Sequence, residues 1–182
     1  MCVAALLYVS AAAQNLVNLR SSSFSKAFAE VLLDYPNNFN NITGDLVLSQ
    51  GEFEHYASTV KLPGARSCIV GKYHSLSDST ASWQAVMYSH DEFELASKEY
   101  RKIFRQLKTT PVTLVDGSKI YLVGEMAELD ESHDFSVSTF YFPTADTRYR
   151  DFKVELEMLY SMNEWVINLN LVKRKKDEEE AW

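Results

Sequence analysis

The feature that most constrains the fold is a pair of segments, residues 152–160 and 165–171, in which apolar and polar residues alternate. The apolar residues are Phe152, Val154, Leu156, Met158 and Tyr160 in the first segment, and Trp165, Ile167, Leu169 and Leu171 in the second. Alternation of period two places the apolar residues on one face of a β-strand. Because only a short polar stretch separates the segments, we expect a long antiparallel hairpin with one buried and one polar face.

Two other segments have the period of an α-helix. The first stripe consists of Phe24, Ala27, Phe28, Val31, Leu32 and Tyr35, with Pro36 to end the helix. The second consists of Phe93, Ala96, Tyr100, Ile103, Phe104 and Leu107, and it follows Ser89 and Glu92 at the spacing of a capping box. The sequence therefore predicts two amphipathic helices.

The remaining segments of strand-like composition are separated by turn residues. They cover residues 52–60, 67–74 and 82–88 between the helices, and 112–115, 119–123 and 135–142 after them, whereas residues 37–44 read as a polar loop. Short connections favour antiparallel pairing. We expect an α+β fold with two amphipathic helices packed on a mainly antiparallel sheet of about six to eight strands, in the order helix, three strands, helix, strands.

The chain has 182 residues, which is the size of one domain, and it divides into three parts. Residues 1–13 resemble the end of a secretory signal peptide, because the apolar run Val3–Val9 is followed by small residues at Ala11 and Ala13. An apolar element of the fold is the alternative. Residues 14–172 form a single α+β domain, and residues 173–182 form a charged C-terminal tail.

These features predict an exported protein, periplasmic or in the cell envelope if the source is bacterial. The apolar run is too short for a transmembrane segment, which needs about 20 residues. With 18 Lys and Arg against 25 Asp and Glu, the net charge of −7 argues against a nucleic-acid partner. Cys68 lies in an apolar run and is expected to be buried and unreactive.

Sequence motifs of the common catalytic chemistries are missing. The six glycines form no phosphate-binding loop, and no serine elbow or zinc-binding pattern occurs. The sequence therefore predicts no cofactor and no metal site. It favours a non-catalytic protein over an enzyme, although catalytic side chains from distant positions could still converge.

Two polar clusters are candidate ligand sites. Arg148 and Arg150 flank Tyr149, so that two guanidinium groups could hold a carboxylate or phosphate while the ring stacks on it. His133 lies among Asp130, Glu131 and Asp134 and could assist hydrolysis or hold a cation. The favoured alternatives are structural: a charge-paired turn with Asp146 and Asp151 for the arginine cluster, and a polar turn between strands for the His133 cluster.

Together, these observations predict a small exported binding module that contacts another protein or an envelope component through a sheet face or edge. The alternative is a protein that binds or hydrolyses a small anionic molecule at His133 or at Arg148, Tyr149 and Arg150. A structural subunit of an envelope assembly is a third possibility. The sequence leaves the oligomeric state undetermined.

Overall fold

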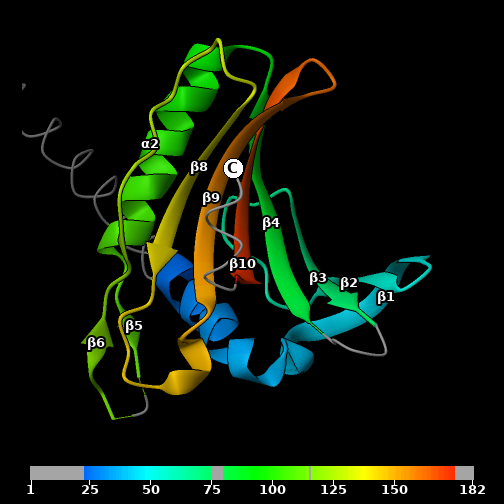
Figure 1. Ribbon diagram of the computed structural model, residues 1–182, viewed down its shortest axis with the longest axis vertical. Coiled ribbons are helices and arrows are strands. Elements are labelled where there is room, and N and C mark those ends of the chain that lie inside the picture. The colour runs from blue at the N-terminus through cyan, green and yellow to red at the C-terminus, as the bar shows by residue number, and fades with distance from the viewer. Residues whose placement is uncertain (1–22, 75–79, 115, 175–182) are drawn as a thin grey trace, which may run out of the picture.

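The computed structural model describes residues 23–74, 80–114 and 116–174. Over these ranges the chain is an α+β protein built on an eight-stranded antiparallel sheet with two helices (Figure 1). The signal-like residues 1–13 and most of the predicted tail lie outside the described residues. Of that tail, Lys173 is the last residue of a strand and Arg174 follows it.

The N-terminal half contains one helix and the first four strands. Residues 23–34 are helical, and two short 3-10 helices, η1 (Tyr35–Asn37) and η2 (Asn40–Ile42), connect them to the sheet. The strands are β1 (Thr43–Gln50), β2 (Phe53–Ser58), β3 (Ser67–Tyr73) and β4 (Ala81–His90). These four strands lie side by side in chain order, so that β1 pairs with β2, β2 with β3 and β3 with β4.

The C-terminal half begins with the long helix α2 (Phe93–Thr109). The elements after it are β5 (Val112–Thr113), β6 (Lys119–Ile120), β7 (Val123–Gly124), β8 (Phe135–Tyr141), η3 (Thr147–Tyr149), β9 (Phe152–Ser161) and β10 (Glu164–Lys173). β5 and β6 form a separate two-stranded hairpin (Figure 1). The main sheet has the order β1-β2-β3-β4-β10-β9-β8-β7, so β10 and β4 form the junction between the halves.

The predicted order of three strands between the helices is wrong, because four are present. The additional strand is β1, which includes the last two residues of the segment expected to be a loop. Its pairing with β2 shifts between Thr43 and Leu46 and again between Leu46 and Leu48. These bulges remove the strict alternation from which a strand is recognised in sequence.

The expected C-terminal hairpin is present as β9 and β10. Their register runs without a break from Glu164 opposite Ser161 to Lys173 opposite Phe152. Met162 and Asn163 connect the strands with φ angles of 51° and 65°. Two consecutive positive φ values are typical of a type I′ turn, whose twist matches that of the paired strands.

The start of α2 differs from the prediction of a capping box. The residue at the N-cap position is Glu92, and it makes no capping hydrogen bond through its side chain. The backbone N–H of Glu92 instead donates to Nδ1 of His90 at 3.0 Å. Ser89 belongs to β4, where its hydroxyl accepts a hydrogen bond from the Arg66 guanidinium.

One core joins both helices to one face of the sheet. The first helix contributes Phe24, Phe28, Val31 and Leu32, and α2 contributes Ala96, Tyr100, Ile103, Phe104 and Leu107. Trp83 on β4 is fully buried, and its indole N–H donates to the Ser58 hydroxyl at 2.9 Å. Cys68 is buried as a free thiol, and burial raises its pKa, which agrees with the expected unreactive state.

The polar face of the β9–β10 hairpin is less exposed than its sequence suggests. Lys153, Glu155, Asn168 and Asn170 are each less than 10% exposed. Glu155 accepts hydrogen bonds from Nε and Nη2 of Arg174 at 3.1 and 3.2 Å. The Lys153 ammonium lies 3.6 Å from the centre of the Tyr141 ring. Pairing of these charges makes their burial tolerable in the middle of the sheet.

Candidate binding surfaces

The predicted ligand residue Arg148 forms an ion pair with Asp146 at η3. Nη2 of Arg148 lies 2.6 Å from Oδ2 of Asp146, and Nε lies 3.0 Å from both carboxylate oxygens. The hydrogen bonds from Arg148 lower the pKa of Asp146. The guanidinium of Arg148 is therefore already paired with the Asp146 carboxylate within the same turn.

Tyr149 and Arg150 point into different environments. Tyr149 is 7% exposed, and its hydroxyl donates to the Leu32 carbonyl at 3.4 Å. Burial raises the pKa of Tyr149 to about 12. The side chain of Arg150 is 81% exposed, and its Nε lies 4.0 Å from a carboxylate oxygen of Asp151. Tyr149 thus belongs to the core, whereas Arg150 is held only loosely.

A hollow of about 330 Å³ lies beside these residues. Its lining consists of Tyr141, Phe142, Thr144, Ala145, Asp146, Thr147, Tyr149, Arg150 and Phe152. Arg148 does not contribute to the lining. Two of the three predicted residues, Tyr149 and Arg150, therefore border one hollow, and Arg150 supplies the positive charge of its lining.

His133 lies in an exposed turn rather than in a pocket. All residues from Asp130 to Asp134 are exposed, and the carboxylate of Asp130 accepts hydrogen bonds from the backbone N–H and hydroxyl of Ser132. Those hydrogen bonds lower the pKa of Asp130. In the described part of the chain, no three His, Cys, Asp or Glu residues lie close enough to hold a metal ion.

The edge strand β1 exposes an apolar surface that the sequence analysis did not identify. Leu46, Val47 and Leu48 are 53%, 63% and 43% exposed, although they are consecutive residues of one strand. All residues of β1 from Asp45 to Gln50 are exposed, so this part of the strand has no buried face, and its register with β2 shifts at bulges. Within the part of the chain that the structure describes, β1 pairs with β2 alone, so its other side is an unpaired edge of the sheet. We call these three residues the β1 patch.

The opposite edge of the sheet is shorter and carries a positive charge. β7 has two residues, and the Lys108 ammonium donates to the carbonyl of Gly124 at 3.3 Å. Short edge strands and lysine side chains discourage pairing with another chain. The two edges of the sheet therefore differ, and only β1 combines eight residues of strand with an exposed apolar run.

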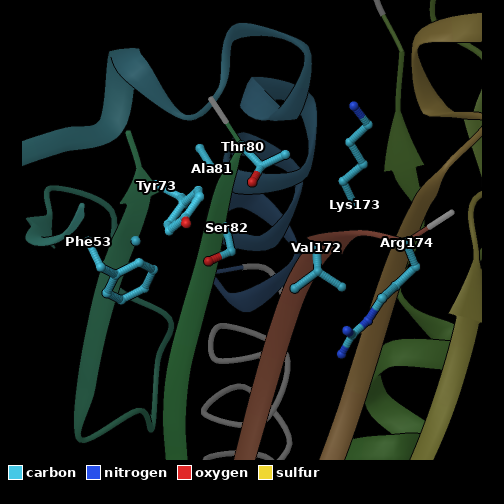
Figure 2. A pocket seen from close by; sticks show the side chains of 9 residues that line it. Phe53, Tyr73, Thr80, Ala81, Ser82, Val172, Lys173 and Arg174 are labelled. Atoms are coloured by element: carbon cyan, nitrogen blue, oxygen red, sulfur yellow. The ribbon is translucent and has the colours of Figure 1, made fainter. Parts of the chain in front are cut away.

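A smaller pocket of about 170 Å³ lies where β2, β3 and β4 approach the end of β10 (Figure 2). Its lining consists of Phe53, Gly71, Tyr73, Thr80, Ala81, Ser82, Val172, Lys173 and Arg174. Gly71, Ser82 and Val172 alternate along their strands with the buried residues Val70, Trp83 and Leu171. The pocket therefore opens on the sheet face opposite the core.

The fold and these surfaces define an α+β protein with a single eight-stranded antiparallel sheet. No family model, no curated protein and no solved structure matches the chain. Within the described ranges, neither helix has the length and apolar character needed to cross a membrane.

Proposed function

We propose that this chain is an exported, non-catalytic protein that binds a partner protein through the edge strand β1. The observation that carries the proposal is the β1 patch on an unpaired sheet edge. The signal-like residues 1–13 and the missing catalytic motifs support export and a binding role.

The physical basis is the free energy of apolar burial. Three consecutive large apolar side chains in water are an unusual feature for a sheet edge, where proteins place charges or proline. Transfer of their exposed area into an interface contributes roughly 25 cal/mol per Å². The unpaired backbone groups of β1 can add hydrogen bonds to an extended segment of the partner.

The experiment uses a photo-crosslinking amino acid at Val47 and, as a matched control, at Leu95, which is a 40% exposed residue of α2. Extracts of the source organism are irradiated with each protein. We expect a specific adduct from position 47 and none of the same mass from position 95. The crosslinked partner is then purified and its affinity measured.

Val47→Lys is expected to weaken that affinity at least tenfold, because a buried, unpaired ammonium opposes association. Leu95→Lys should leave it unchanged. Both substitutions affect exposed positions, so thermal unfolding should change little and verifies that the fold is intact. Equal affinity of the Val47→Lys variant, or equal crosslinking from both positions, would contradict the role of β1.

A second candidate function is the binding of a small anion in the hollow beside η3. It is supported by the loosely held Arg150 among the aromatic residues of that hollow. We expect inorganic phosphate to perturb NMR signals of residues 141–152, and Arg150→Gln to weaken phosphate binding about fivefold. Arg101→Gln, which changes an exposed residue of α2, is the control. Identical titrations of wild type and Arg150→Gln would exclude this site.

A further inference from the structure

We propose that the carboxyl group of Glu157 binds a proton from solvent and donates it in a hydrogen bond to the side chain of Asn170, on the sheet face opposite the core. This inference is independent of the partner site at β1. It rests on an unpaired acceptor atom, on the side chains that surround this atom and on the burial of this face. The result is a pH-sensitive contact between β9 and β10.

The observation that points to a bound proton is Oδ1 of Asn170, a buried amide oxygen without a donor. Asn170 is 7% exposed, and no described residue donates a hydrogen bond to its Oδ1. Buried acceptors of this kind are rare in native proteins, because the atom has lost water and gained nothing in exchange. The oxygen therefore needs a hydrogen from a neighbouring group.

The side chains around Asn170 leave Glu157 as that donor. Glu155 lies directly opposite Asn170 on β9, and Gln84 lies opposite it on β4. Arg174 donates to Glu155 through Nε and Nη2 at 3.1 and 3.2 Å, and neither Gln84 nor Arg174 donates to Oδ1 of Asn170. Glu157 is the diagonal neighbour on β9, at a spacing that long side chains bridge. Once protonated, it supplies the missing hydrogen.

The amide group of Asn170 matches a carboxylic acid in shape and in hydrogen bonding. The Glu157 carboxyl group already accepts hydrogen bonds from the side-chain amides of Asn170 and Asn168. A primary amide has an N–H donor beside its oxygen, and a protonated carboxyl group has an oxygen beside its O–H donor. A protonated Glu157 can therefore return its O–H to Oδ1 of Asn170. The two hydrogen bonds close a ring that joins β9 to β10.

The surroundings favour the neutral form of this carboxyl group. Burial raises the pKa of Glu157, and the nearby Glu155 carboxylate also raises it. The two amide hydrogen bonds and the charge of Arg174 act in the opposite direction, but the pKa remains above its usual 4.5. Arg174 is paired with Glu155, and the Lys153 ammonium lies over the Tyr141 ring. Within the described chain, the facing residues of β8 and β4 carry no charge: they are Val137, Thr139, Gln84 and Val86.

The proton links the stability of the β9–β10 hairpin to pH. Because the pKa of Glu157 is higher in the folded chain than the usual 4.5, its contribution to stability is complete below pH 4.5. The contribution is lost as the pH rises through the pKa of the folded chain. Ionised Glu157 then places a carboxylate beside Oδ1 of Asn170 and beside Glu155 with no hydrogen between them, which weakens the pairing of the two strands.

Glu157→Gln tests the assignment, because glutamine has the shape and hydrogen bonds of the protonated acid and cannot ionise. Urea denaturation of wild type and variant between about pH 4 and pH 8 gives the ratio of their unfolding equilibrium constants. We expect the constant of wild type to rise relative to that of Glu157→Gln by about threefold or more across this range. Glu164→Gln, at the exposed start of β10, is the matched control and should show no such change. A ratio for Glu157→Gln that does not depend on pH would overturn the proposal.

An NMR titration of the wild-type chain locates the proton directly. The side-chain carboxyl carbon of Glu157 should titrate above pH 4.5, and the side-chain amide signals of Asn170 should shift with the same midpoint. A midpoint at or below pH 4.5, or amide signals of Asn170 that do not follow it, would remove the proposed contact. This readout needs no substitution, so it decides the question even if Glu157→Gln does not fold.

Discussion

Trp83→Ala is expected to lower the free energy of unfolding by about 3–5 kcal/mol. The Trp83 side chain is fully buried on β4, next to the junction with β10. Its replacement removes the largest fully buried side chain and leaves a cavity. It also removes the N–H that donates to the Ser58 hydroxyl at 2.9 Å. Because the free energy of unfolding of a domain is only about 5–15 kcal/mol, this single substitution can remove a large part of it.

Urea denaturation followed by circular dichroism measures this effect. Trp83→Phe retains most of the buried ring and loses the hydrogen bond, so it should lose less stability than Trp83→Ala. Phe135→Ala is the surface control, because Phe135 is 54% exposed on β8. A loss below about 1 kcal/mol for Trp83→Ala would show that Trp83 is not packed as described.

Tyr100→Phe is expected to lower the free energy of unfolding by about 1–3 kcal/mol at pH 7. The Tyr100 hydroxyl lies at the centre of the core, 2.7 Å from both the Leu156 carbonyl and the Ser138 hydroxyl. Phenylalanine preserves the ring and its packing. The loss therefore measures the hydrogen bonds that join α2 to strands β8 and β9.

The same hydroxyl makes stability depend on pH in the alkaline range. Burial raises the pKa of Tyr100 from 10.0 to about 12. The unfolded chain thus ionises first as the pH rises. The contribution of Tyr100 is complete below pH 10 and is lost as the pH rises from 10 to about 12, to a total of about 3 kcal/mol.

Urea denaturation of wild type and Tyr100→Phe across this range separates the two effects. The free energy of unfolding should fall less steeply in Tyr100→Phe, because the ionisation of Tyr100 no longer contributes. Part of the fall should remain, because Tyr149, whose pKa is also raised to about 12, is present in both proteins. Tyr160→Phe alters an exposed tyrosine and should match wild type at pH 7. Parallel alkaline profiles for wild type and Tyr100→Phe would contradict the buried hydroxyl.

The sequence predicts the fold best where periodicity and turn chemistry agree. The runs at 152–160 and 165–171 predict both strands and their register, because a shift of one residue would expose the whole apolar set. The same reasoning fails at β1, where bulges place Leu46, Val47 and Leu48 outside the alternating pattern. It also fails to predict the burial of Lys153 and Glu155, which depends on partners from other strands.

The candidate sites were harder to predict, because they depend on how distant segments meet. Arg148, Tyr149 and Arg150 are adjacent in sequence, yet the ring of Tyr149 enters the core and Arg148 binds Asp146. The pocket in Figure 2 combines residues from the consecutive strands β2, β3 and β4 with residues at the end of the distant strand β10. One local signal was available, namely Gly71 in the middle of an apolar strand.

The position of β10 between β4 and β9 has a consequence for the kinetics of folding. The pairing of Leu171 with Trp83 closes a loop of more than 80 residues, and such distant contacts slow the search for the native state. During synthesis, strands β1 to β4 leave the ribosome long before β10, and β4 retains an unpaired edge until residues 164–173 arrive. The sheet therefore cannot be completed until the last strand of the chain is available, and the edge of β4 stays open to other contacts until then.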